Sequence, residues 1–216
     1  MRRPFLTTPH DSRFAVYLIP PYRVARDIAE IHYMLRKQFG FAAADRLQVH
    51  ATMKGFFKKN DLPISQLIAG LDSVFEAQNP FWVEISPKFR SDQIGMGLDI
   101  SNSGTALNPK LMDLRERIVG VVQPFIAEDC DFVKEDLGKP FRGHVTLAFR
   151  DIPPEMYDDV LFHEVADVAA QVHIGRGAAL HEGLLIRVVV RPAAGVGVGQ
   201  SYLTFDGWNE MLVHHR

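Results

Sequence analysis

The sequence predicts an α+β fold made of two similar halves. Short stretches rich in β-branched and aromatic residues alternate with amphipathic stretches, which is typical of mixed strands and helices. The tripeptide His-x-Thr occurs twice, at His50–Thr52 and at His144–Thr146. Around both tripeptides the expected order is helix, His-x-Thr strand, proline-started helix, strand, strand. This repeated order predicts an internal duplication of one α+β unit.

The first half begins with a short apolar strand and an amphipathic helix. Ile28, Ile31 and Leu35 recur at three- and four-residue spacing, and Gly40 follows as a helix stop. The expected elements are a strand at residues 14–20, a helix at 24–39, a motif strand at 47–57, a helix from 62–63, and strands at 81–89 and 94–101 joined by a turn at 91–93.

The second half is expected to open with a helix. Asn108 is a good N-cap and Pro109 suits the first helical position, so a helix should run from there towards Ile126. The remaining expected elements are a polar connection at residues 129–139, a motif strand at 142–150, a helix from 153–154 to about 172, and strands at 184–191 and 200–205. The glycine-rich residues 193–199 lack the Gly-Lys-Ser/Thr ending of a phosphate-binding loop, which favours a flexible hairpin connection.

Composition limits the class of protein. The chain has 216 residues, of which 47% are hydrophobic and 23% charged, as in an ordinary globular protein. We treat residues 1–216 as one domain with two lobes. No stretch approaches the roughly 18 apolar residues that a membrane helix needs. Cys130 is the single cysteine, so no intrachain disulfide is possible, which fits a cytoplasmic location.

The net charge of −2 bears on the partner. Proteins that hold long nucleic acids usually carry a basic face, because phosphate neutralisation supplies much of the affinity. The charge therefore favours a small phosphorylated substrate or an RNA end over a long duplex. We expect a monomer, because two lobes of one chain would complete the site.

Alternation along a strand gives each motif a polar face. His50, Thr52 and Lys54 would point one way, and Ala51 and Met53 the other. In the second motif strand the polar face would carry Arg142, His144, Thr146 and Arg150, and the apolar face Val145, Leu147 and Phe149. A pseudo-two-fold axis relating the halves would bring the two polar faces together across a cleft.

Two histidines facing each other suit phosphodiester hydrolysis. One neutral imidazole can take a proton from the attacking oxygen, and one protonated imidazole can give a proton to the leaving oxygen. The hydroxyls of Thr52 and Thr146 would donate to the non-bridging phosphate oxygens, where charge develops in the transition state. This mechanism needs neither a metal nor a cofactor, and it predicts a bell-shaped pH profile.

The same residues allow other interpretations. A histidine in a strand is often structural, and the same fold could serve a non-catalytic module that binds a nucleotide or RNA end. A metal hydrolase would lose activity in chelator. His163-Glu164 and His181-Glu182 lack the second histidine of a zinc-protease motif. Cys130 lies among acidic residues, which disfavours a nucleophilic thiolate.

At the motif residues the sequence resembles the 2H phosphoesterase superfamily. Residues 140–150 (PFRGHVTLAFR) are similar to the second motif of its RNA 2′,3′-cyclic phosphodiesterase branch, also called 2′–5′ RNA ligase. Residues 49–57 (VHATMKGFF) are similar to the first motif. The resemblance implies a bilobal α+β fold with a central cleft and metal-independent catalysis. It maps the family's functional positions onto His50, Thr52, His144 and Thr146.

The resemblance leaves the substrate open among 2′,3′-cyclic phosphates, 2′,5′-linked oligonucleotides, ADP-ribose cyclic phosphate and RNA ends. Any ligase activity would be the reverse reaction. Beside the motifs, Lys54, Arg142 and Arg150 are candidates for phosphate contacts. Phe57 and Tyr202 are candidates for stacking on a base, because aromatic faces bind bases with little sequence preference.

Overall fold

The structure is a computed structural model. It describes residues 12–79, 81–85, 89–92, 95–103, 105–130, 141–153, 178–179 and 185–192; for 12–13, 89–92, 178–179 and 185–192 it describes the backbone alone. The elements in chain order are β1 (Ser12–Ile19), α1 (Tyr22–Phe39), β2 (Ala51–Lys58), α2 (Ile64–Glu76), β3 (Trp82–Val83), β4 (Phe89–Asp92), β5 (Gly95–Asp99), β6 (Asn102–Ser103), β7 (Ala106–Leu107), α3 (Pro109–Val122), β8 (His144–Phe149), β9 (Ala178–Ala179) and β10 (Leu185–Pro192).

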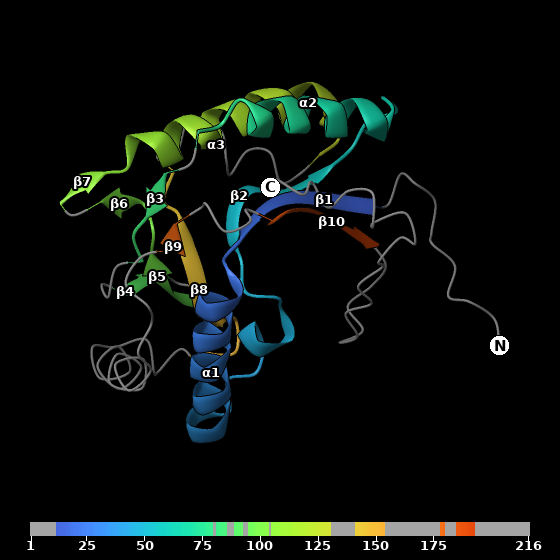
Figure 1. The fold of residues 1–216 in the computed structure, drawn as a ribbon. Coiled ribbons are helices and arrows are strands. Elements are labelled where there is room, and N and C mark those ends of the chain that lie inside the picture. Colours follow the sequence, from blue (N-terminus) through green and yellow to red (C-terminus); the bar gives the residue numbers. More distant parts are fainter. Residues whose placement is uncertain are drawn as a thin grey trace.

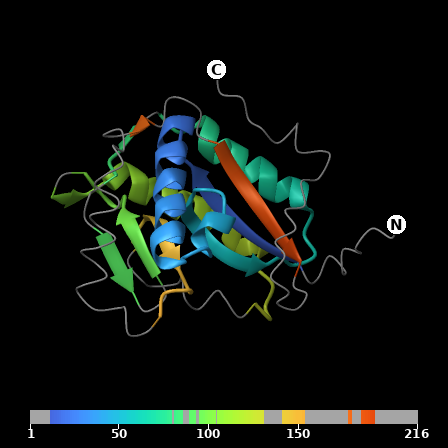
Figure 2. The same cartoon turned by 90° about the horizontal axis from the view of Figure 1, so that it is seen from below.

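The main sheet has six strands in the order β10-β1-β2-β8-β5-β4, and all of its pairs are antiparallel. The α+β class is therefore confirmed. Figure 1 shows α2 and α3 running together along the upper side, and α1 standing beside β8. In Figure 2, seen from below, α1 lies in the foreground. The two motif strands, β2 and β8, are neighbours in the middle of the sheet.

One face of the sheet packs against the helices. Leu18, Ala51, Val145 and Leu98 lie in one row across four strands, because each is the register partner of the next. All four are buried, and they share one core with residues of the three helices, among them Ile28, Leu67 and Leu114. The opposite face of β2 and β8 is therefore the face that reaches solvent.

Two predicted helix ends are confirmed. Gly40 ends α1 in the left-handed region at φ 80°, which glycine adopts without steric cost. The side-chain oxygen of Asn108 accepts hydrogen bonds from the backbone N–H groups of Lys110 and Leu111, so Asn108 caps α3 ahead of Pro109. The helix ends at Val122 and continues as a short 3-10 helix, Gln123–Phe125.

Other boundaries differ from the prediction. The 3-10 helix Ala44–Arg46 follows α1, and β2 begins only at Ala51. The strand expected at 81–89 is divided into β3 and β4, and β3 pairs with β9 outside the main sheet. Ser91 and Asp92, expected in a turn, lie in β4. This strand is at the sheet edge, where polar residues are tolerated because one side needs no strand partner.

The second half can be compared with the first only in part. β10 confirms the strand expected at 184–191. The helix expected beyond residue 153 and the strand at 200–205 fall outside the described residues, as does the segment 193–199. Both motif strands follow a strand and a helix, and each pairs antiparallel with that strand: β2 with β1 and β8 with β5. None of the described helices combines the length and the apolar character needed to cross a bilayer.

Candidate active site

The pairing of β2 with β8 brings the two motifs together. Ala51 is the register partner of Val145, and both side chains are buried in the core. Continuing this antiparallel register by one residue would place Thr52 opposite His144, and His50, which directly precedes β2, opposite Thr146. Because side chains alternate between faces, these four polar side chains share the face opposite to the core.

This arrangement sets the spacing of the site. Directly opposed residues have Cβ atoms about 4.5–5.5 Å apart, and diagonal neighbours lie about 7–8 Å apart. Each histidine is therefore beside the threonine of the other strand, and the two histidines are diagonal neighbours. The side chain of His144 is exposed, and those of His50, Thr52 and Thr146 are partly exposed. A substrate can reach all four.

The two histidines make the same hydrogen bond. Nδ1 of His50 lies 2.6 Å from the carbonyl oxygen of Gln48, and Nδ1 of His144 lies 3.2 Å from that of Arg142. In both cases the carbonyl belongs to the residue two positions earlier. A carbonyl can only accept, so Nδ1 carries the hydrogen and donates it. In each neutral ring Nδ1 is therefore the protonated nitrogen, and Nε2 carries the lone pair.

Tyr17 of β1 supports His50. Their ring centroids are 4.0 Å apart with the planes tilted by 33°, and Tyr17 is the register partner of Thr52. Tyr17 belongs to a small apolar cluster with Ala15 and Ile19, on the face opposite to the main core. Sequence reasoning did not single out Tyr17. The sequence shows that Tyr17 alternates with apolar residues of β1, but its position beside His50 depends on how β1 pairs with β2.

Strand β5 supports His144. Gly97 is the register partner of Thr146, and Asp99 is that of His144. A Cβ atom on Gly97 would lie 3.2 Å from Cδ2 of His144 and 2.8 Å from the carbonyl oxygen of Val145. The ring of His144 therefore lies close over a position without a side chain. The carboxylate of Asp99 accepts hydrogen bonds from the backbone N–H of Ser101 at 2.9 Å and from Nδ2 of Asn102 at 2.7 Å.

A third histidine, on α1, contacts the backbone of the second motif. Nε2 of His32, on α1, lies 2.8 Å from the carbonyl oxygen of Thr146, and His32 is only 4% exposed. Burial lowers the pKa of His32 below its ordinary value, against the opposing effects of the Thr146 hydrogen bond and the charge of Asp45. A neutral ring that bonds a carbonyl through Nε2 carries its hydrogen there.

Lys54 does not share the polar face, so that prediction is wrong. Tyr17 pairs with Thr52, but the preceding Val16 pairs with Lys54, so β2 holds one extra residue at this point. Such a bulge shifts the alternation of side chains. Lys54 lies opposite a core residue, is 2% exposed, and donates from Nζ to the carbonyl oxygen of Gly55 at 3.2 Å.

Phe57 is also wrongly predicted. It has no exposed surface and lies opposite Phe14, with ring centroids 5.8 Å apart. A ring enclosed on both faces cannot stack on a base, so Phe57 is a core residue. Tyr202, the other aromatic candidate, lies outside the described residues.

The two arginines differ. Arg142 is exposed, and its backbone carbonyl accepts the hydrogen bond from His144. The role of its side chain in phosphate binding stays a prediction. Arg150 was expected on the same face as His144, but β8 has an irregularity between Thr146 and Ala148 that breaks the alternation. Its backbone has φ 63°, and its guanidinium lies 5.1 Å from the ring centre of Phe149. The regular alternation that predicted a shared face for Arg150 is therefore broken, and its contact with phosphate stays a prediction.

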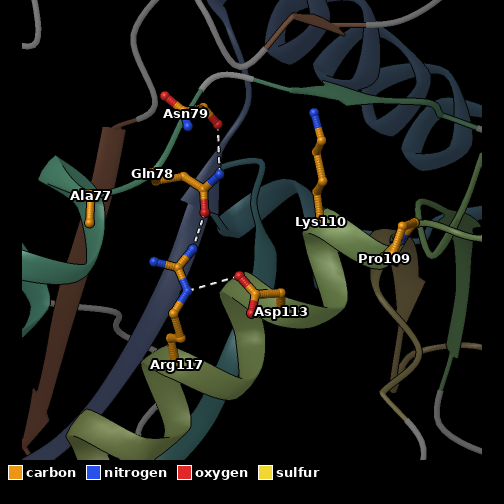
Figure 3. A pocket seen from close by; sticks show the side chains of 7 residues that line it. All are labelled: Ala77, Gln78, Asn79, Pro109, Lys110, Asp113 and Arg117. Carbon is orange, nitrogen blue, oxygen red and sulfur yellow. Dashed lines mark hydrogen bonds and ion pairs between the residues drawn. The ribbon is translucent and has the colours of Figure 1, made fainter.

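A hollow of about 400 Å³ lies elsewhere, between the end of α2 and the start of α3 (Figure 3). Its polar side chains bond one another. Arg117 donates to Asp113 at 2.9 Å and to the side-chain oxygen of Gln78, and Gln78 donates to the carbonyl oxygen of Asn79 at 2.6 Å. The hollow contains none of the predicted site residues, and the side chains of Arg117, Asp113 and Gln78 are engaged in these bonds.

The described residues contain no group of three or more His, Cys, Asp or Glu side chains that could hold a metal ion. Cys130 is buried, and its sulfur accepts a hydrogen bond from the backbone N–H of Lys58 at 3.1 Å. His163 and His181 fall outside the described part of the chain.

Comparison with protein-family models and with curated proteins gives no match. Function is therefore inferred from the two motifs and their geometry.

Proposed function

We propose that this chain is a metal-independent phosphodiesterase that hydrolyses a 2′,3′-cyclic or 2′-linked phosphodiester of a nucleotide or RNA end. The observation that carries the proposal is the pairing of β2 with β8. It puts His50 and His144 on one accessible face, with the same nitrogen of each ring bonded to the backbone.

The spacing of the histidines suits an in-line displacement. The attacking and leaving oxygens lie on opposite sides of phosphorus, and each is joined to an imidazole by a hydrogen bond of about 2.8 Å. An acid and a base that act together must therefore stand several ångströms apart. Diagonal neighbours on adjacent strands, about 7–8 Å apart, leave room for one phosphate group between the rings.

The fixed tautomers suit both catalytic roles. With the hydrogen of Nδ1 donated to a backbone carbonyl, a neutral ring offers the lone pair of Nε2 as base. A protonated ring offers the Nε2 hydrogen as acid and keeps the same backbone bond. Thr52 and Thr146, each beside the histidine of the other strand, donate their hydroxyl hydrogens to the non-bridging oxygens.

The proposal includes the bilobal arrangement. The units β1–α1–β2 and β5–α3–β8 share the order strand, helix, strand and the same antiparallel pairing, although the short pair β6–β7 is inserted before α3. This order supports a pseudo-two-fold relation between two half-repeats. The two motifs would then line one central cleft. One chain would supply the whole site, so we propose a monomer acting on small nucleotides or RNA ends in the cytoplasm.

The test is hydrolysis of 2′,3′-cyclic mononucleotides and 2′,5′-linked dinucleotides in the presence of a chelator. We expect turnover by the wild type and a loss of about 10²–10⁴-fold in kcat/KM for both His50→Ala and His144→Ala. Thr105→Ala, on the exposed turn between β6 and β7, is the surface control and should match the wild type. Saturable nucleotide binding without turnover would favour the non-catalytic binding module. Activity abolished by chelator would contradict the two-histidine mechanism.

A further inference from the structure

We propose that His32 of α1 is a positioning residue for Thr146, holding the backbone of the second motif so that the threonine hydroxyl meets the phosphate. The inference rests on the proposed function and extends it to a residue outside both motifs. His32 touches no substrate in this arrangement. It acts through the peptide group that follows Thr146.

The contact between His32 and Thr146 is a direct hydrogen bond from a buried side chain. Nε2 of His32 donates to the carbonyl oxygen of Thr146 at 2.8 Å, and the histidine is 4% exposed. The residues differ by 114 positions in the chain, so the bond joins α1 to the motif strand across the fold. Ile28, Ile31 and Leu35 place the same side of α1 in the core. His32 is therefore a polar side chain on the packed side of the helix.

The strand needs this support because its pairing is irregular at Thr146. On one side, Ala51–Val145 is the register pair that the described residues record between β2 and β8. On the other side, Gly97 pairs with Thr146 but Met96 pairs with Ala148, so Leu147 is an extra residue. A bulge leaves its extra residue unpaired and disrupts the ladder locally. The hydrogen bond from α1 fixes the peptide at that point.

A second contact keeps α1 beside β8 when His32 is changed. The carboxylate of Asp151, just beyond β8, accepts hydrogen bonds from the backbone N–H groups of Ala42 and Ala43 at 2.6 and 2.7 Å. These residues follow α1 in the chain. Together with the apolar core, this contact lets a His32 variant fold with α1 in place, while the carbonyl of Thr146 loses the hydrogen bond from His32.

The test is a double-mutant cycle with His32→Leu and Thr146→Ala, together with His32→Gln. Leucine removes the donor, and glutamine supplies an N–H group at a similar reach. We expect His32→Leu to lower kcat roughly 10- to 100-fold, the scale expected when a catalytic group is misplaced by up to about 1 Å. KM should change by less than threefold, and His32→Gln should restore most of the rate.

The cycle separates positioning from general support. If His32 acts through the hydroxyl of Thr146, His32→Leu will cost little further activity in the Thr146→Ala background. Equal losses in both backgrounds would overturn the inference, as would full activity of His32→Leu. Val24→Ala, a buried change about two turns earlier in α1, controls for weakened helix packing and should leave kcat unchanged.

A measurement without turnover distinguishes failure of this inference from failure of the proposed function. Proton–nitrogen NMR of the His32 ring should show a neutral imidazole with its hydrogen on Nε2. A hydrogen on Nδ1 would overturn the inference whatever the activity. Absence of turnover in the wild type, with the Nε2 form present, would instead count against the proposed phosphodiesterase and the catalytic role of Thr146 together.

Discussion

Gly97→Ala should damage catalysis more than it damages the fold. The added Cβ would lie 3.2 Å from Cδ2 of His144, closer than ordinary van der Waals contact, so the ring must move by a few tenths of an ångström. It would also lie 2.8 Å from the carbonyl oxygen of Val145, which forces a backbone shift in β8. Since a misplacement of 1 Å can cost about 10²-fold in rate, we expect kcat to fall roughly tenfold.

The matched variant is Gly95→Ala in the same strand. Its Cβ would lie 2.4 Å from the carbonyl oxygen of Ala148, a more severe backbone conflict that involves no motif side chain. Overpacking of this kind costs about 1–3 kcal/mol of unfolding free energy. We therefore expect Gly95→Ala to lose more stability and Gly97→Ala to lose more activity.

The assay pairs urea unfolding with steady-state hydrolysis of a 2′,3′-cyclic nucleotide, at a temperature where every variant is folded. If Gly95→Ala cannot be obtained folded, Gly70→Ala replaces it, because its Cβ would meet only the side chain of Val121, at 2.8 Å. A Gly97→Ala protein with wild-type kcat, or a loss of kcat equal to that of the control, would refute the placement of His144 over Gly97.

Three further predictions address other contacts. Tyr17→Leu should lower kcat more than Tyr17→Phe, because only phenylalanine keeps a ring against His50; similar rates for both variants would contradict the stacking role. Burial holds the pKa of His32 below its ordinary 6.5, so the unfolded chain binds the proton more readily. The unfolding free energy should therefore fall as pH drops below about 6.5 towards the folded-state pKa, and His32→Gln should remove that part of the pH dependence in urea titrations. Phe57→Ala should cost about 3–5 kcal/mol of stability, and in nucleotide titrations of the folded fraction it should leave affinity unchanged; a selective loss of affinity would restore its predicted role in base stacking.

The sequence predicted what regular alternation and helix ends determine. His144 and Thr146 share a face because no irregularity separates them in β8. His50 directly precedes β2, and its ring packs against Tyr17, the register partner of Thr52. The cap at Asn108 and the stop at Gly40 depend on local backbone chemistry, which a single sequence displays. The duplication predicted that the two polar faces meet across a cleft, and it did not predict that β2 and β8 are neighbouring strands of one sheet, as the structure records.

The errors arise where the ladder is irregular. The prediction placed Lys54 and Arg150 on the polar face because side chains alternate along a regular strand. An extra residue in each strand interrupts that alternation. Bulges depend on how two strands pair, so one strand's sequence does not locate them. His32 lay within the apolar stripe of the expected helix, between Ile31 and Leu35. A buried polar residue in such a stripe needs a partner, and that need was the available signal.

The narrow contact between β2 and β8 has a consequence for how this site can be altered. Few backbone bonds across that contact fix the distance between the histidines, so the distance depends on the buried row Leu18, Ala51, Val145 and Leu98 beneath them. A change of volume at Ala51 would alter the distance between the two histidines, with all four motif residues intact. Under the proposed function, selection for phosphodiesters of different size would thus act on apolar residues that no substrate touches.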